Sequence, residues 1–275
     1  MRIHGLCLVK NESDILPYFF QESLRWCDRI YVFDNGSTDA TWEIVNEIAR
    51  EHPAVVPALR EDCPFDDSLR AKLFHRHRDD AAVGDWWCRL DADEIYIDDP
   101  RSFLARVPAH DHVVWAIHLQ YYMTTADLVR FAPEDESRAP NIDRSNLPRY
   151  YAADASESRF FRHRLRLDWP ANAAWPRHLG IVTPERIRLK HLQYRSPAQI
   201  QRRLDTRRQA EAHGWRHFGH SLEKTWREKI VDPSGLAFDS FDGNFEIDPK
   251  RLPRHLETPG RRALKRVMHA LHVWP

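Results

Sequence analysis

Strand-like and helix-like segments alternate through the N-terminal third of the chain, and this alternation constrains the fold more than any other feature. The short apolar runs typical of buried strands are residues 3–9, 29–33, 54–59 and 86–90. The segments between them that carry apolar residues at helical spacing are residues 14–26, 41–50 and 67–82. Strands separated by helices form βαβ units, in which the strands run parallel. We therefore predict an α/β fold with a mostly parallel sheet flanked by helices.

The second half of the chain has a less regular pattern. Residues 112–123 and 186–192 predict strands, whereas residues 124–157 are polar and dotted with proline, as in a loop or lid. Ser196 followed by Pro197 starts a helix well, because serine caps a helix and proline fits its first turn. We expect a domain of residues 1–195 and a helical C-terminal extension of residues 196–275.

Composition excludes several classes of protein. The 275 residues include 41 basic and 41 acidic side chains, and this neutral balance argues against a nucleic-acid partner. No apolar run approaches the roughly 20 residues of a membrane-spanning helix, and the first residues do not resemble a signal peptide. We expect a cytoplasmic protein. The four cysteines form no CxxC pair, which favours buried structural thiols over a disulfide framework or a zinc site.

Acidic side chains stand at the ends of two predicted strands. Asp34 ends the second strand, and the sequence Asp91-Ala-Asp-Glu94 follows the fourth. Ligands of open parallel sheets bind outside the carboxyl ends of the strands. Asp91 and Asp93 reach one ion if the chain turns there, and their hard oxygen atoms suit Mg²⁺ or Mn²⁺. The spacing alone is equally consistent with a turn on a solvated face. Asp34 is followed by Asn-Gly, so a simple turn before a capped helix competes with a ligand-binding role.

Three motifs, in this order and at these strand ends, resemble the signatures of family 2 glycosyltransferases with the GT-A fold. They are Leu8-Val-Lys-Asn-Glu-Ser13, Val32-Phe-Asp-Asn-Gly-Ser-Thr-Asp39 and Trp87-Cys-Arg-Leu-Asp-Ala-Asp-Glu94. The Asp-Ala-Asp-Glu form and the later Leu189-Lys-His-Leu-Gln-Tyr-Arg-Ser196 are similar to a bacterial subgroup. The resemblance covers residues 3–97 well and the rest loosely. It implies a metal-dependent, inverting hexosyltransferase that moves a sugar from a nucleotide-sugar donor to a hydroxyl acceptor in bacterial polysaccharide or glycoconjugate synthesis.

The resemblance also implies roles for single residues. Residues 1–97 would form the nucleotide-sugar-binding half and residues 98–195 the acceptor half. The residues implied to contact the donor are Asn11 and Glu12 beside the nucleotide, Asp34 at the base and Asp91 at the diphosphate. The residues implied to hold the Mn²⁺ or Mg²⁺ cofactor are Asp91, Asp93 and His191. The chain departs from the family where Val9-Lys10 replaces a proline and a tyrosine, which puts the preferred base in doubt.

No clear match exists for the acidic motif that supplies the general base in many inverting members, so the base is inferred from chemistry. A carboxylate must lie within hydrogen-bond reach of the acceptor hydroxyl. Asp127, after the long strand, and Glu134, in the polar loop, are the candidates, and solvated loop acids are the alternative interpretation. Arg70 and its basic neighbours on the third predicted helix either pair with the diphosphate or are surface charges.

The C-terminal segment is basic and amphipathic. Residues 251–275 contain six lysine or arginine residues and one acid, Glu257. Apolar side chains at helical spacing are Leu264, Val267, Met268 and Leu271. Such a helix either lies on an anionic membrane surface through residues 259–272 or packs on its own domain. Membrane contact would suit a lipid-linked acceptor and a location at the inner face of the membrane.

Two other functions compete with the transferase interpretation. A phosphoryl or nucleotidyl transferase fits poorly, because the acidic motif follows the fourth strand and no glycine-rich loop follows the first. A non-catalytic nucleotide-sugar or carbohydrate-binding protein on a transferase fold is the remaining alternative. The acids at both strand ends argue against it.

Overall fold

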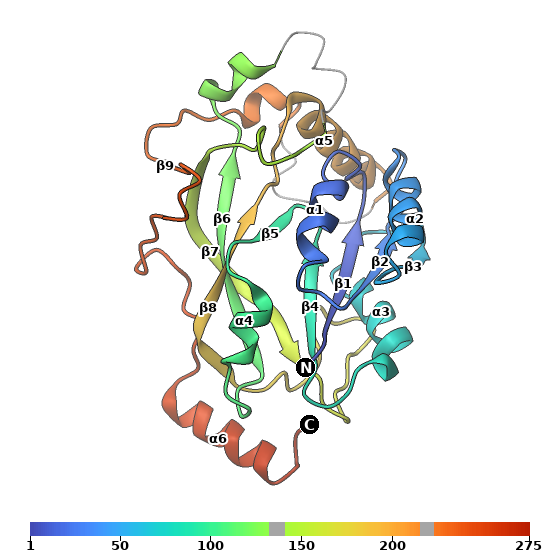
Figure 1. Cartoon of the computed structure of the whole chain (residues 1–275), viewed down its shortest axis with the longest axis vertical. Helices are drawn as coiled ribbons and strands as arrows, with labels where there is room; N and C mark the ends of the chain where they lie inside the picture. Colours follow the sequence, from blue (N-terminus) through green and yellow to red (C-terminus); the bar gives the residue numbers. More distant parts are fainter. Residues whose placement is uncertain (132–140, 215–222) are drawn as a thin grey trace.

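The computed structural model describes residues 1–131, 141–214 and 223–275. Figure 1 shows one large sheet with helices around it. The elements are β1 (Ile3–Val9), α1 (Leu16–Ser23), β2 (Arg29–Asp34), α2 (Thr41–Glu51), β3 (Val55–Arg60), α3 (Leu69–His77), η1 (Arg78–Asp80), β4 (Trp86–Asp91), β5 (Glu94–Tyr96), α4 (Pro100–Ala105), β6 (Val113–Tyr122), η2 (Thr125–Arg130), β7 (Tyr150–Arg162), β8 (Val182–His191), α5 (Pro197–Ala212), η4 (Trp226–Lys229), β9 (Ala237–Phe238) and α6 (Pro259–Ala270).

The N-terminal third is the parallel α/β unit predicted from the sequence. Its strands lie in the order β3-β2-β1-β4 and all run in the same direction. Alternate residues of β1 enter two different hydrophobic clusters, with Cys7 and Val9 on one face and Leu6 and Leu8 on the other. Such burial on both faces explains why the strand is a continuous apolar run. The four cysteines are free thiols, of which Cys7, Cys27 and Cys88 are buried and Cys63 is only partly buried.

The second half extends the same sheet with mixed pairing. β7 runs antiparallel to both β4 and β6, β6 pairs parallel with β8, and β5 is antiparallel to β8. The prediction of a loop over residues 124–157 is wrong for its last part, because residues 150–157 belong to β7. Pairing with β6 satisfies the backbone of this polar stretch, and its composition does not reveal that partner.

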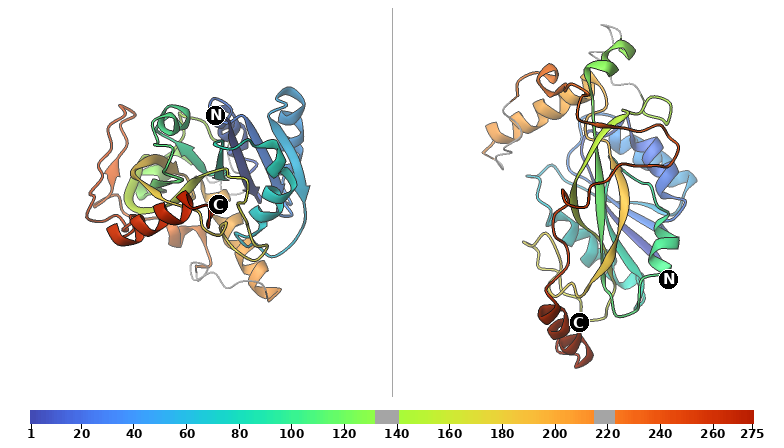
Figure 2. Two further views of the ribbon diagram at one scale, coloured as in Figure 1. Left: turned by 90° about the horizontal axis from the view of Figure 1, so that it is seen from below. Right: turned by 90° about the vertical axis from the view of Figure 1, so that its left-hand side faces the viewer.

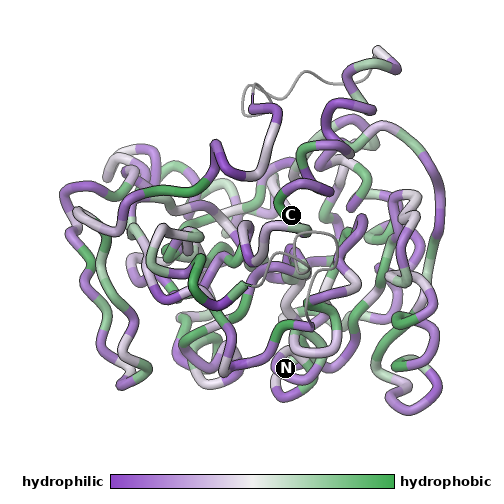
Figure 3. Tube along the Cα trace, turned by 90° about the horizontal axis from the view of Figure 1, so that it is seen from above, coloured by the Kyte–Doolittle hydropathy of each residue, from purple (hydrophilic) through white to green (hydrophobic). Residues whose placement is uncertain are grey.

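The two C-terminal helices lie at opposite ends of the molecule. α5 lies at the carboxyl ends of the parallel strands, whereas α6 lies beyond their amino ends (Figures 1 and 2). Seen from above, hydrophobic stretches run through the centre and hydrophilic stretches dominate the outer loops (Figure 3). Within the described parts of the chain, no helix combines the length and the apolar character needed to cross a bilayer.

Candidate functional site

Three parallel strands bring the predicted site residues to one edge of the sheet. In the strand register Val9 of β1 lies opposite Asp34 of β2, and Leu8 lies opposite Asp91 of β4. The motifs after these strands therefore meet, although they are far apart in the sequence. We call Glu12, Asp34, Asp91 and Asp93 the strand-end acids.

Asn11 connects the loops that follow β1 and β2. Its φ of 58° places it in the left-handed region, which asparagine tolerates better than most residues. Its backbone N–H donates to Ser37 Oγ at 2.9 Å, and its Oδ1 accepts from the backbone N–H of Thr38 at 2.8 Å. Its Nδ2 donates to Thr206 of α5 at 3.2 Å. Asn11, which the resemblance places beside the nucleotide of the sugar donor, thus connects the loop after β1 to the loop after β2 and to α5.

Asp34 is completely buried at the end of β2. One carboxylate oxygen accepts from the backbone N–H of Ser37 at 2.8 Å, and the other lies 3.2 Å from Arg60 Nε. Gly36 follows with a φ of 74°, and a Cβ at this position would lie 2.8 Å from Cα of Asp62. Asp34 therefore shapes the turn into α2, as the turn interpretation expects. A ligand-binding role for the same side chain stays a prediction.

Asp91 is occupied by two arginine side chains. Arg70 of α3 binds Oδ1, and Arg159 of β7 binds Oδ2 at 3.1 Å. Burial raises the pKa of Asp91, but these guanidinium groups outweigh burial and hold the pKa at about 2. Both carboxylate oxygens thus have cationic partners. Arg70, one of the basic residues considered for the diphosphate, is itself fully buried beneath this acid.

Asp93 faces a different set of partners from Asp91. Its Oδ2 lies 3.5 Å from His191 Nε2 at the end of β8 and accepts from Arg203 Nη1 of α5 at 3.0 Å. Burial raises the pKa of Asp93, and His191 and Arg203 lower it well below its ordinary range. The structure therefore brings together Asp93 and His191, two of the predicted metal ligands, whereas Asp91 is neutralised by arginine.

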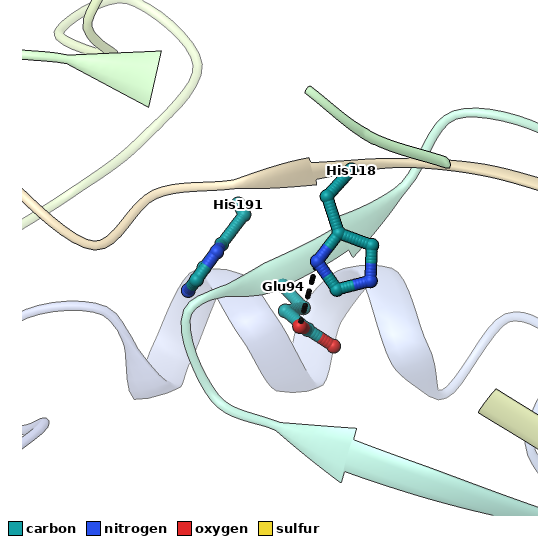
Figure 4. Close-up of side chains that lie close together, drawn as sticks. All are labelled: Glu94, His118 and His191. Carbon is teal, nitrogen blue, oxygen red and sulfur yellow. Dashed lines mark ion pairs between the residues drawn. The ribbon is translucent and has the colours of Figure 1, made fainter. Parts of the chain in front are cut away.

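Glu94 and His118 lie next to His191 (Figure 4). Glu94 comes from β5, His118 from β6 and His191 from β8, and one potential ligand atom of each of the three lies within 4.8 Å of the others. Burial and the nearby Arg159 hold the pKa of His118 well below its ordinary value, which favours a neutral imidazole. Neither Glu94 nor His118 is among the ligands predicted from the sequence. The Glu94 carboxylate belongs to the recognised motif, but nothing in the sequence distinguishes His118 among sixteen histidines.

Arginine side chains from the C-terminal part of the chain neutralise the strand-end acids. Arg195 donates to Glu12 at 2.6 Å and to both oxygens of Asp14 at 2.8 Å. Arg202 donates to Asp39 at 2.9 Å, in the loop before α2. Arg202 belongs to a run of basic residues, 201–208, whereas nothing in the sequence marks Arg195 for this role. Glu12, placed beside the nucleotide by resemblance, is therefore paired with Arg195, two residues before α5.

Of the two candidate bases, Asp127 and Glu134, the structure describes Asp127. Asp127 is buried in η2, where Oδ2 accepts from the backbone N–H and from Oγ1 of Thr124, each at 2.8 Å, and Oδ1 pairs with Arg130. These contacts make it a helix cap. Glu134 lies outside the described residues.

A cavity of about 590 Å³ is lined by Ile95 and Lys190, which lie close in the sequence to Asp93 and His191. Tyr96, Phe241 and Phe245 line it together with Lys190 and Asp239. None of the strand-end acids lines this cavity. Aromatic and charged groups coexist in it, but the acids, arginines and histidines described above converge elsewhere, so we locate the candidate site at the strand ends.

Comparison with known proteins gives only distant structural likenesses. The sequence matches no family model and no curated protein. The structure is similar to the mannosyltransferase PcManGT from Pyrobaculum calidifontis, solved with GDP-Man and Mn²⁺, at 16% identity and a TM-score of 0.41 over 78% of this chain and 64% of that one. It is similar to residues 1–349 of TarS from S. aureus, solved with UDP, at 14% identity and a TM-score of 0.32 over 50% of this chain and 40% of that one. The chain thus spans less than two thirds of each of these proteins.

Proposed function

We propose that this protein is a metal-dependent glycosyltransferase that transfers a sugar from a nucleotide-sugar donor to a hydroxyl group. One observation carries the proposal: the parallel register aligns the Asn11-Glu12, Asp34 and Asp91–Asp93 motifs at one sheet edge, and β8 brings His191 within 3.5 Å of Asp93. The order and the placement of the motifs match what the family resemblance implies. Family 2 membership, inversion and a part in bacterial polysaccharide or glycoconjugate synthesis belong to the same proposal.

The residues at the strand ends fit a divalent cation. Asp93 offers carboxylate oxygens, and His191 Nε2 lies 3.5 Å from Asp93 Oδ2, close to the separation of two ligand atoms on one ion. We assign Asp93 and His191 to the metal and regard Asp91 as a residue that positions the turn through Arg70 and Arg159. A bound divalent ion would stabilise the negative charge that develops on the departing diphosphate. Arg203, which contacts Asp93, is suited to the same diphosphate.

The base requires a carboxylate that an acceptor can reach. The oxygens of Asp127 are occupied by its helix cap and by Arg130. Glu157 of β7 fits better, because its side chain is 43% exposed and lies 3.9 Å from His118 Nε2, although its Oε1 also accepts from Arg159 at 2.7 Å. We propose Glu157 as the group that accepts the proton of the acceptor hydroxyl.

The test is a thermal-shift panel of UDP-, GDP-, CMP- and dTDP-sugars, each with Mn²⁺ and with EDTA. A ligand that binds only the folded protein raises its melting temperature. We expect one nucleotide class to raise it in Mn²⁺ and not in EDTA, and Asp93→Asn to abolish that shift. Asp205→Asn, on the exposed face of α5, is the matched control and should respond like the wild type. No shift with any donor would contradict the proposal.

A non-catalytic sugar-nucleotide-binding role is the second candidate. The double arginine pairing of Asp91 favours it, because this acid is satisfied within the protein itself. The two functions differ in turnover. Slow hydrolysis of the bound donor by the wild type, lost in Asp93→Asn, would support the enzyme, and binding without hydrolysis or transfer would support the second candidate.

The proposed membrane contact and the proposed acceptor site lie at different ends of the protein. α6 docks at the start of β8 through Arg262, which donates to the backbone oxygen of Val182, whereas His191 ends the same strand in the site. Ten residues of strand span roughly 33 Å. A lipid-linked acceptor would therefore need a glycan long enough to reach from the bilayer to the opposite edge of the sheet. We propose a soluble or long-chain acceptor.

A further inference from the structure

Glu94, His118 and His191 converge from three neighbouring strands. In the sheet register Glu94 of β5 lies opposite His191 of β8, and His191 lies opposite Gln120 of β6, two residues beyond His118. Residues two apart on a strand share a face. The fold therefore directs all three side chains to the same side of the sheet, and Figure 4 shows them facing one another.

One buried polar atom of each residue in this trio has no hydrogen-bond partner among the described residues. Glu94 Oε1 is held by Arg159, but Oε2 is buried and has no hydrogen-bond partner among the described residues. The same is true of His118 Nε2 and His191 Nδ1. Glu94 is 1% and His118 3% exposed, so water cannot easily solvate them. Buried polar atoms without partners are costly, and a bound cation would satisfy them.

We propose that Glu94 and His118 join His191 in binding one divalent transition-metal ion, and that it is the same ion assigned above to Asp93 and His191 in the proposed transferase. One potential ligand atom of each residue lies within 4.8 Å of the others. Around a bound ion, with bonds of about 2.1 Å, such atoms lie roughly 3 to 3.5 Å apart, so small side-chain rotations suffice. The second clause of this proposal rests on the proposed function, whereas the site itself does not.

The donor set selects the metal. Two imidazoles and one carboxylate suit Mn²⁺, Fe²⁺, Co²⁺ or Zn²⁺, whereas Mg²⁺ prefers oxygen ligands and retains water. The cofactor is accordingly Mn²⁺ or a similar transition metal, and not Mg²⁺. Arg159 holds the other oxygen of Glu94 and also binds Asp91 at 3.1 Å. It thereby orients the Glu94 carboxylate, as outer-shell partners of metal ligands commonly do.

Direct titration with metal alone tests the site. Wild-type protein is titrated with Mn²⁺ or Co²⁺ by calorimetry and by the visible absorption of Co²⁺, first alone and then with UDP or GDP. We expect one ion per chain, with Mg²⁺ binding at least tenfold more weakly. Glu94→Gln and His118→Gln should each weaken Mn²⁺ binding at least tenfold. His112→Gln, a buried histidine just before the other end of β6, is the matched control and should bind like the wild type.

Circular dichroism establishes that each variant is folded. If a variant does not fold, pulsed electron paramagnetic resonance of the Mn²⁺-loaded wild type replaces it, and coupling to two imidazole nitrogens is the expected result. Wild-type affinity in both Glu94→Gln and His118→Gln, no imidazole coupling, or no ion bound under either condition overturns the proposal. If nucleotide sugars then still raise the melting temperature without metal, binding of the donor is retained and only the metal site is rejected. Conversely, metal binding without any response to nucleotide sugars would retain the metal site and contradict the proposed function.

Discussion

Arg203 Nη1 lies 3.0 Å from Asp93 Oδ2, and this contact joins the helix α5 to the turn after β4. Arg203 also lies 3.7 Å from Glu12 Oε1. One guanidinium group thus neutralises acids from two separate motifs. A cation bound at Asp93 would compete with Arg203, and a diphosphate would attract it.

Arg203→Ala is expected to change metal and nucleotide binding in opposite directions. Removing the competing charge should leave Mn²⁺ affinity unchanged or raise it, whereas loss of a bidentate phosphate partner should weaken nucleotide-sugar binding about tenfold, or about 1.4 kcal/mol. Calorimetry with each ligand separately measures both effects. Arg208→Ala, whose side chain pairs with Asp205 on the same helix, is the control. Weaker binding of both ligands would instead indicate a purely structural role for Arg203.

Arg159→Met should destabilise the fold strongly. Arg159 is 2% exposed and pairs with Asp91, Glu94 and Glu157, so its removal leaves the buried Glu94 without a counter-charge and takes one of two cations from Asp91. Breaking such buried pairs costs about 3–5 kcal/mol. Urea denaturation measures the free energy of unfolding. Arg25→Met, which breaks an exposed pair with Glu22, should cost no more than about 1 kcal/mol. Equal losses in the two variants would show that the buried pairs are not needed for stability.

The contribution of three buried histidines to the free energy of unfolding is expected to fall as pH is lowered from 7 to 5. Burial lowers the pKa of His4 and His163, and it lowers the pKa of His112 to about 3. Below about pH 6.5 the unfolded chain takes up protons that the folded histidines refuse, so acid favours unfolding. For His112 the loss reaches up to about 2 kcal/mol by pH 5. Denaturation at several pH values between 7 and 5 measures this effect. The free energy of unfolding should change less with pH in His112→Gln than in the wild type, and an equal change would contradict the lowered pKa of His112.

α6 is expected to bind anionic vesicles through its outer face. Arg262 donates to Asp111 at 2.9 Å and Lys265 to the backbone oxygen of Gly180 at 2.6 Å, so the basic side of the helix docks on the protein. Leu264, Val267 and Leu271 are more than half exposed on the other side. Exposed apolar side chains of this kind favour insertion at a membrane surface.

Co-sedimentation with phosphatidylglycerol vesicles tests this expectation. The double variant Leu264→Glu, Val267→Glu should lose binding at least tenfold, whereas Val129→Glu, an equally apolar and more exposed position on η2, should not. Equal binding by all three proteins, or none by the wild type, would count against a membrane role. In that case the exposed apolar side chains of α6 are available to contact a second protein.

Local patterns accounted for most of the first hundred residues. The apolar run at residues 3–9 is β1 to the residue, and Ser196 does cap α5 by accepting from the backbone N–H of Gln199. Helix and strand periodicities are short-range properties, so a sequence displays them directly. The strand from Tyr150 was missed because its residues become a strand only through pairing with β6.

The residue pattern places acids at the ends of parallel strands, and the carboxyl ends of such strands meet at one edge of the sheet. The partner of each acid at that edge depends on the folded protein. Asp91 meets Arg70 and Arg159, Asp93 meets His191 and Arg203, and Asp127 is turned into a helix cap. These partners come from distant segments, and their charges act through space once packing has excluded water. Residue spacing in the sequence does not show which distant side chains lie close together in space. His118 and the arginines could therefore be found only in the folded protein.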